Sequence, residues 1–221
     1  LLATGTGTVV LADLTVSDAS GIGLHVLGPD LHVGHVVVQG TTAEGGPGHG
    51  IEVQGSTLVE VYESRLVQNA GAGLVAFGAQ IVLMHGAGTP PTVAVPGDLG
   101  DETYWDPPLA IGSNGQGGVS IVDPTPPDDP LSIVYPSIFD PDLPVDPDYA
   151  LHMSGADVFG NGQYGVGLYG ASASMVRTAI RGCTLVGPFG DGLVVAPPST
   201  GEIAGQVAVS VDEDSVIGAN T

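Results

Sequence analysis

Hydrophobic and polar residues alternate along short stretches of this chain, as they do in β-strands that have one buried face and one exposed face. Residues 58–67, LVEVYESRLV, place Val59 and Val61 on one side and Glu60 on the other. Residues 31–38, LHVGHVVV, repeat the pattern. Strands of this length cannot bury their apolar side alone, so we expect them to stack in successive turns of the chain.

A glycine motif separates these strands at recurring intervals. Gly-x-Gly-[Leu/Ile] occurs as GIGL, GHGI, GAGL, GVGL and GDGL, with a looser GQGGV between the third and fourth copies. We align the copies on their last glycines, which are Gly23, Gly50, Gly73, Gly118, Gly167 and Gly192. The intervals are 27, 23, 45, 49 and 25 residues, so we expect coils of about 25 residues, two of which carry insertions.

A second column of residues supports the same repeat. Five positions before this column the residues are small or apolar, as at Ser64 and Ala156, and we align Cys183 with them as a buried, inert residue. The column itself precedes each glycine-rich turn and follows an apolar residue by three positions. Its asparagines are Asn69, Asn114 and Asn161.

The pattern GIxVxG…xVxVxxSxLVxNxGxG resembles the repeat of right-handed parallel β-helix proteins of the pectin-lyase-like superfamily, over about residues 8–85 and 109–221. The resemblance implies an all-β solenoid of about six to seven coils, and no specific enzyme family within the superfamily matches. It also implies that Asn69, Asn114 and Asn161 form a structural turn ladder. The same coil serves lyases, hydrolases, epimerases, tailspikes and adhesins, so the resemblance predicts fold rather than activity.

We expect a single β-helix domain over residues 1–221, as a segment of a longer chain with flanking domains, because neither end shows a cap. Two loop insertions are expected within it, at about 86–108 and 123–148. Residues 86–148 hold 13 of the 18 prolines, and proline cannot donate to a strand ladder. The resemblance implies that such inserted turns build a binding groove beside the helix.

The first insertion holds aromatic residues beside acids, in the segment ETYWDPP. Tyr104, Trp105 and Asp106 are therefore candidate ligand-binding residues, with the two rings as a sugar-stacking platform. The alternative is that Trp105 packs the loop onto the coil surface, and this alternative is favoured.

The second insertion holds the segment DPDLPVDPD, whose carboxylates are hard oxygen ligands suited to Ca²⁺. The segment lacks the glycine turn and terminal glutamate of an EF-hand loop, so a solvated acidic loop is favoured over a calcium site. The candidate calcium ligands are Asp140, Asp142, Asp146 and Asp148.

The chain carries 24 acidic and 3 basic residues, and its formal net charge is −21. Lys and Arg neutralise phosphates, so this balance excludes nucleic acid as a partner. Polyanionic sugars would be repelled unless a divalent cation bridges them to the protein. No apolar stretch is long enough to span a bilayer, so membrane insertion is not expected, and an export signal would lie outside this segment.

The motifs of two classes of carbohydrate-active enzyme, polysaccharide lyases and inverting glycoside hydrolases, are largely missing from this sequence. A polysaccharide lyase needs a base and cationic or Ca²⁺ neutralisation of the substrate acid. The three arginines, Arg65, Arg177 and Arg181, are expected to be surface ion-pair partners instead. Of the motifs typical of an inverting polygalacturonase, residues 48–50, Gly-His-Gly, are the one match. We therefore interpret His49 as the variable middle residue of a glycine turn and the least constrained residue of its coil.

His25, His32 and His35 lie on neighbouring predicted strands, but the sequence shows no third ligand beside any two of them. No firm metal site and no cofactor are therefore expected, and Ca²⁺ is left open.

These observations lead to one hypothesis and two alternatives. We expect a non-catalytic, extracellular or cell-surface, bacterial β-helix scaffold that displays loops for binding carbohydrate or a cell-surface glycan. The alternatives are a carbohydrate-active enzyme, either a polysaccharide lyase or a glycoside hydrolase, and a structural stalk of a larger adhesin. Clustered carboxylates or basic groups on adjacent outward positions would favour the enzyme.

Overall fold

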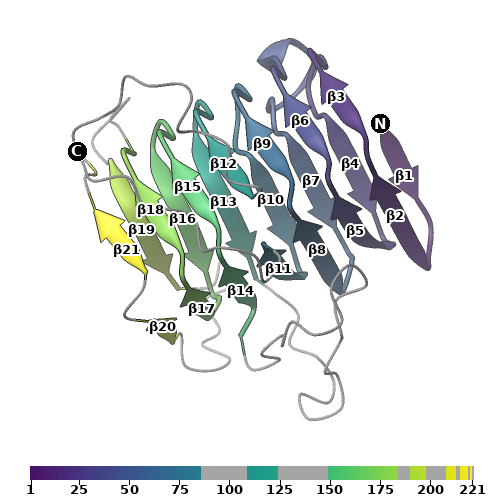
Figure 1. Ribbon diagram of the computed structural model, residues 1–221. Helices are drawn as coiled ribbons and strands as arrows, with labels where there is room; N and C mark the ends of the chain where they lie inside the picture. The colour runs from purple at the N-terminus through teal and green to yellow at the C-terminus, as the bar shows by residue number, and fades with distance from the viewer. Residues whose placement is uncertain are drawn as a thin grey trace.

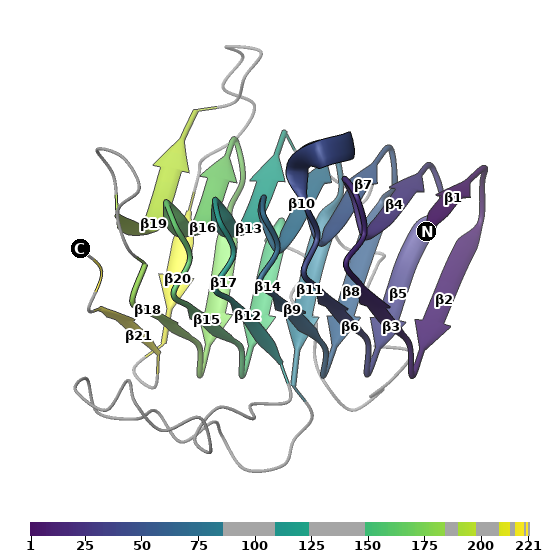
Figure 2. The same ribbon diagram turned by 90° about the horizontal axis from the view of Figure 1, so that it is seen from above.

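The protein is a right-handed parallel β-helix of seven coils, as the sequence predicts (Figure 1). Every coil contributes one strand to each of three parallel sheets before the chain moves on by one strand. β1 and β21 lie at opposite ends of the solenoid (Figure 2). The computed structural model describes residues 1–85, 109–123, 149–183, 190–197, 208–212, 215–218 and 220.

The sheets are named A, B and C in the order in which a coil passes through them. Sheet A contains β1 (Leu2–Thr4), β4 (Leu24–Leu27), β7 (Ile51–Gln54), β10 (Leu74–Phe77), β13 (Gly117–Val122), β16 (Tyr164–Tyr169) and β19 (Asp191–Ala196). Sheet B contains β2 (Thr8–Ala12), β5 (Asp30–Gly34), β8 (Leu58–Tyr62), β11 (Gln80–Met84), β14 (Leu151–Ser154), β17 (Ala173–Val176) and β20 (Val209–Val211). Sheet C contains β3 (Thr15–Ser17), β6 (Val37–Gln39), β9 (Arg65–Val67), β12 (Ala110–Gly112), β15 (Asp157–Phe159), β18 (Ala179–Arg181) and β21 (Val216–Gly218).

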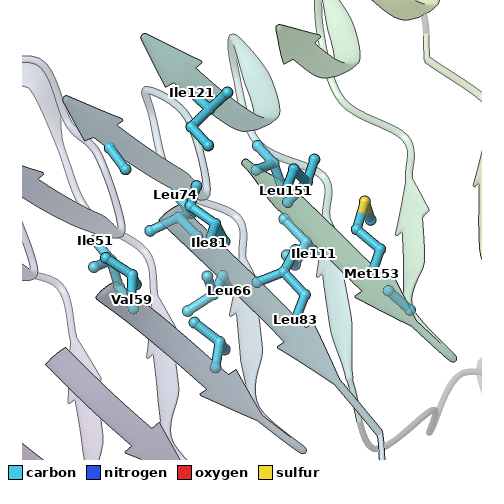
Figure 3. Packing of buried hydrophobic residues seen from close by; sticks show 14 of the residues in the cluster. Ile51, Val59, Leu66, Leu74, Ile81, Leu83, Ile111, Ile121, Leu151 and Met153 are labelled. Atoms are coloured by element: carbon cyan, nitrogen blue, oxygen red, sulfur yellow. The ribbon is translucent and has the colours of Figure 1, made fainter. Parts of the chain in front are cut away.

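The inward side chains of the three sheets meet in one continuous core. Val59 and Val61 of β8 are fully buried, and Val59 stacks between Leu31 and Ile81 of the neighbouring coils. Ile81 in turn lies beside Leu151, so equivalent positions form apolar columns along the solenoid (Figure 3). Each such side chain contributes about 1.5–3 kcal/mol by leaving water.

One register prediction is wrong. β16 pairs with β13 through Gly117 and Tyr164, and with β19 through Tyr164 and Asp191. The glycine column therefore continues through Gly165 and not through Gly167. Side chains alternate with a period of two along a strand, so a slip of two residues leaves the same side chains inward. Hydrophobic alternation alone cannot distinguish the two registers.

The glycine column exists because successive coils approach too closely there for a side chain. A Cβ atom added at Gly50 would lie 2.7 Å from the carbonyl oxygen of Gly73 and 2.8 Å from Nδ2 of Asn69. A Cβ atom at Gly118 would lie 2.5 Å from the carbonyl oxygen of Gly165. The recurring motif thus marks a contact between coils rather than a chemical site.

Both insertions are connected to sheet B at neighbouring strands. Residues 86–108 join β11 to β12 in the fourth coil, and residues 124–148 join β13 to β14 in the fifth. Asp123 still belongs to the coil, since its backbone N–H donates to the carbonyl of Tyr169 at 2.9 Å. β11 and β14 pair directly, so one insertion leaves the end of one strand and the other enters at the start of its neighbour.

Helical structure is minor. The described residues include a short 3-10 turn, η1 (Ala43–Gly45), and no apolar helix of membrane-spanning length.

Candidate functional site

A ladder of asparagine side chains lines the bend between sheets C and A. Asn69 Nδ2 donates to Asn114 Oδ1 at 3.1 Å, and Asn114 Nδ2 donates to Asn161 Oδ1 at 3.0 Å. The same two oxygens accept the backbone N–H groups of Asn69 and Asn114, at 3.0 and 3.2 Å. The three amides therefore satisfy buried backbone groups of the bend. Each also donates to one backbone carbonyl, of Val38, Leu66 and Ile111 respectively.

Cys183 lies in this same column. Ile180 pairs with Val158, which places Cys183 opposite Asn161, so its alignment five residues earlier in the coil is wrong. Its backbone N–H donates to Asn220 Oδ1 at 3.0 Å, as the ladder requires. Burial raises the pKa of the Cys183 thiol to about 11, although a backbone hydrogen bond from Asn161 opposes the shift. The prediction that Cys183 is buried is confirmed.

The candidate ligand residues of the two insertions lie outside the described residues. This applies to the proposed stacking platform, Tyr104, Trp105 and Asp106, and to the proposed calcium ligands, Asp140, Asp142, Asp146 and Asp148.

The structure reveals pairs of histidine and glutamate that the sequence analysis missed. Three outward glutamates follow three histidines by 27 or 28 residues, which is the length of one coil. Complementary charges repeated at the coil length were the signal that could have found them. The pairs are His25–Glu52 at 3.7 Å, His32–Glu60 at 2.6 Å and His35–Glu63 at 3.6 Å.

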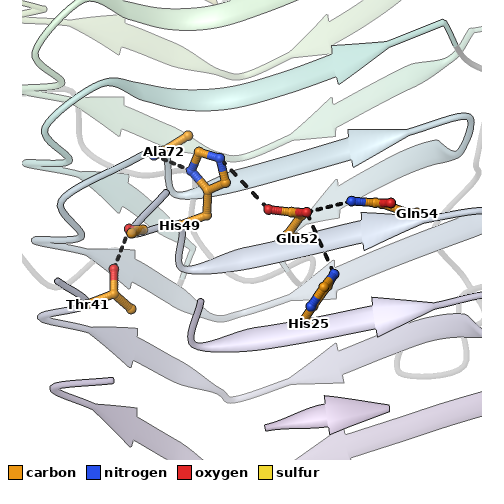
Figure 4. Close-up of polar contacts among 7 residues, drawn as sticks. His25, Thr41, His49, Glu52, Gln54 and Ala72 are labelled. Carbon is orange, nitrogen blue, oxygen red and sulfur yellow. Dashed lines mark hydrogen bonds and ion pairs between the residues drawn. The ribbon is translucent and has the colours of Figure 1, made fainter. Parts of the chain in front are cut away.

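Glu52 of β7 is the centre of one such group, on the outer face of sheet A (Figure 4). Its Oε1 lies 3.7 Å from His25 Nε2 and accepts a hydrogen bond from Gln54 Nε2 at 2.6 Å. Its Oε2 lies 4.0 Å from His49 Nε2. His49 Nδ1 accepts a hydrogen bond from the backbone N–H of Ala72 at 2.9 Å. This network assigns the ring proton of neutral His49 to Nε2, which faces the carboxylate.

His49 is therefore a constrained residue, and the prediction that it is the least constrained of its coil is wrong. Its side chain is 13% exposed, and burial lowers its pKa while the charge of Glu52 opposes the shift. The lone pair of the neutral ring is already used by Ala72, so a substrate proton could bind only if that hydrogen bond broke. The geometry gives His49 a structural role.

On the outer face of sheet B, His32 and Glu60 form a short, buried pair. Glu60 is 2% exposed, and Val82, which lies opposite it in β11, is 4% exposed. At the corner between sheets B and C, Glu63 lies 3.6 Å from His35 Nδ1 and 3.4 Å from His85 Nδ1. Among the described residues, no set of three His, Cys, Asp or Glu side chains has the arrangement of a metal site.

An apolar cluster lies beside this pair, on β8 and on the neighbouring strand β11. Leu58, Val82 and Met84 are each at most 5% exposed although they point away from the core. Most of this part of the outer face of sheet B is therefore covered, and the His32 side chain retains an exposure of 10%.

Arg181 forms an ion pair, as the sequence predicts. Its Nε and Nη2 donate to the two carboxylate oxygens of Asp157 at 3.0 and 2.6 Å. Burial raises the pKa of Asp157, and the hydrogen bonds and charge of Arg181 oppose the shift. Arg65 begins β9, three coils before Arg181 in sheet C, so the two guanidinium groups do not form one site.

No protein-family model matches the chain, and neither a curated protein nor a solved structure matches it. The fold itself defines the class, which is that of the right-handed parallel β-helix proteins.

Proposed function

We propose that the protein is a non-catalytic, extracellular or cell-surface scaffold of the pectin-lyase-like type, whose two insertions bind carbohydrate or a cell-surface glycan. The observation that carries the proposal is the placement of the insertions at opposite ends of β11 and β14, which are paired strands of one sheet. Loops held by a rigid scaffold are where binding residues concentrate. Because the two strands are parallel, the anchors lie at opposite edges of the sheet, a strand length of roughly 13 Å apart, and a ligand that lies along β11 and β14 reaches both loops.

The titratable groups of the described coils favour binding over catalysis. His49 Nδ1 accepts a hydrogen bond from the backbone N–H of Ala72, and Arg181 is paired with Asp157. General acid–base chemistry requires a group within hydrogen-bond reach of a substrate proton. These groups instead hold neighbouring coils to each other.

Charge narrows the class of ligand. With a formal charge of −21, the protein repels polyanionic chains, so a neutral glycan fits best. An acidic glycan would require Ca²⁺ as a bridge, and the aspartates Asp140, Asp142, Asp146 and Asp148 are the residues that we propose would hold it.

A glycan array probed with and without Ca²⁺ tests the proposal, with assays for new reducing ends and for unsaturated products. We expect binding without cleavage, and weaker binding after Trp105→Ala. Val10→Ala is the control, because it shortens an exposed apolar side chain of β2 in the first coil, three coils before the first insertion. Cleavage of any polysaccharide would overturn the non-catalytic function. Absence of binding to every glycan would overturn the binding function and favour a structural stalk.

A carbohydrate-active enzyme, a lyase or a hydrolase, is the second candidate, favoured by the geometry of His32 and Glu60. A carboxylate 2.6 Å from Nδ1 is the arrangement that orients a histidine base. If cleavage is observed, His32→Gln should abolish it, whereas His35→Asn, which changes a more exposed histidine at the sheet corner, should not.

A further inference from the structure

All four asparagines of the chain, Asn69, Asn114, Asn161 and Asn220, lie in the ladder column. Two of them precede glycine, as Asn114–Gly115 and Asn161–Gly162. In an Asn-Gly dipeptide the glycine nitrogen readily attacks the side-chain carbonyl carbon, because glycine has no side chain to obstruct the approach. The ladder thus contains the two most labile amide sites of the sequence.

Packing between coils imposes these two glycines. A Cβ atom at residue 115 would lie 2.4 Å from the carbonyl oxygen of Ala70, and one at residue 162 would lie 2.3 Å from that of Gly115. Both distances are far shorter than van der Waals contact, and the opposing atoms belong to the backbone. A larger residue that would protect the asparagine chemically therefore does not fit.

The folded structure protects both sites in another way. The N–H of Gly115 donates to the carbonyl of Asn69, and the N–H of Gly162 donates to that of Asn114, both at 2.8 Å. The attacking nitrogens are therefore held in hydrogen bonds. The side-chain amides are also fixed by the ladder, and Asn114 and Asn161 are at most 1% exposed, which keeps water from them.

We propose that Asn114–Gly115 and Asn161–Gly162 are self-modification sites gated by opening of the coils. When the coils separate, the glycine nitrogen loses its proton to solvent base and forms a bond with Cγ of asparagine. The bond between Cγ and the side-chain nitrogen breaks, the nitrogen takes up a proton from solvent and leaves as ammonia, and a cyclic imide remains. Water then opens the imide to aspartate or isoaspartate.

The product cannot rebuild the ladder. A carboxylate at position 114 does not donate to the carbonyl of Leu66, and it places a charge where 1% of the residue is exposed. Isoaspartate also lengthens the backbone in the bend. Each opening that leads to reaction therefore leaves a permanent aspartate or isoaspartate in the bend, and this residue hinders return to the native coil.

The test compares the full chain in its native state with the same chain unfolded in guanidinium chloride, at one mildly alkaline pH. Peptide mapping by mass spectrometry would follow the replacement of ammonia by water at each asparagine. We expect the unfolded chain to react at Asn114 and Asn161 well before Asn69, whose neighbour is Ala70. We expect the rate of ammonia loss in the native chain to be lower than in the unfolded chain by a factor on the order of 100 or more. The native rate should follow the fraction of molecules whose coils are open. Equal rates in the two states would overturn the proposal, as would equal rates at Asn69 and Asn114 in the unfolded chain.

A second measurement tests the effect of the product. Asn114→Asp carries one product from the start, and Gln116→Asp makes the same change of charge at an exposed position two residues later. We expect a lower thermal midpoint or loss of folding for Asn114→Asp and little change for Gln116→Asp. Equal midpoints for Asn114→Asp and the unchanged protein would overturn the claim that reaction hinders refolding.

Discussion

His49 Nδ1 accepts a hydrogen bond from the backbone N–H of Ala72, which lies 2.9 Å away in the next coil. The flanking N–H groups of Gly71 and Gly73 bond to backbone carbonyls instead. His49 thus provides the acceptor for a backbone N–H group just before β10 begins. Gly-His-Gly is a motif that invites a catalytic interpretation, but in this protein its histidine side chain joins two coils.

Replacing His49 should lower stability and remove a pH dependence. The folded state lowers the pKa of His49 from its ordinary value of 6.5, chiefly by burial, so folding favours the neutral ring. Above pH 6.5 both states are neutral and the group has no pH effect. As the pH falls through 6.5, the unfolded chain takes up the proton first, so stability decreases until the folded pKa is passed. His49→Ala should cost about 1 kcal/mol at pH 8 and make the decrease between pH 7 and 5 shallower.

Denaturant unfolding at several pH values would measure both effects. Ile22→Ala is the control, because Ile22 occupies the equivalent place in the preceding coil and does not titrate. An unchanged slope in His49→Ala would show that the pKa of His49 is not lowered by the fold.

Removing one amide from the ladder should be costly. Asn114→Ala leaves the backbone N–H of Asn69 and the carbonyl of Leu66 buried without this partner. At about 1–3 kcal/mol for each such group, the free energy of unfolding should fall by roughly 3 kcal/mol. The thermal midpoint would then drop by on the order of 10 °C. Gln116→Ala, an exposed amide on the same bend, should leave the midpoint within about 1 °C; a similar drop in both variants would contradict the ladder's role.

The sequence predicts well which residues face the core, but it predicts poorly which residues of neighbouring coils lie opposite each other. The first depends on alternation within one strand, and the second depends on the register between coils. Alternation along one strand decides that Val59 faces the core, and this needs no knowledge of the neighbouring coil. Val166 and Leu168 are both fully buried, so only pairing with β13 and β19 decides whether Gly165 or Gly167 continues the glycine column. The contact of His32 with Glu60 likewise depends on a coil length of 28 residues, and insertions and small differences between coils obscure that period.

Substitution in the glycine column should be far more harmful than substitution of an exposed glycine. A Cβ atom at Gly118 would meet the carbonyl oxygen of Gly165 at 2.5 Å and Asn161 Nδ2 at 2.9 Å, so Gly118→Ala must push two coils apart. We expect a loss of about 3 kcal/mol in the free energy of unfolding. A Cβ atom at Gly46 meets its nearest neighbour at 3.5 Å, so Gly46→Ala should change stability by less than about 0.5 kcal/mol. Equal losses in denaturant unfolding would contradict the close approach of the coils.

The Cys183 thiol should resist alkylation until the chain unfolds. With a pKa of about 11, roughly one thiol in a thousand is ionised at pH 8, and only the thiolate reacts rapidly. The chain has a single cysteine, so labelling by iodoacetamide reports this site alone. We expect modification in guanidinium chloride to be on the order of 100-fold faster than in the native state. Rapid labelling of the native protein would show that the sixth coil is open.

Cys183→Asn should extend the ladder and stabilise the protein. Cys183 lies between Asn161 and Asn220 in the column, where its backbone N–H already donates to Asn220 Oδ1 at 3.0 Å. The Oδ1 of an asparagine there can accept the N–H of Asn161, which the thiol now accepts weakly. Its Nδ2 can donate to Asn220 Oδ1, as Asn114 Nδ2 donates to Asn161 Oδ1. We expect a gain of about 1 kcal/mol in the free energy of unfolding. Cys183→Ala separates this gain from loss of the thiol, because it removes the acceptor without adding an amide. If Cys183→Asn were less stable than Cys183→Ala, the close contact between Cys183 Sγ and Gly165, where a Cβ atom would lie 3.2 Å from the sulfur, would outweigh the added hydrogen bonds.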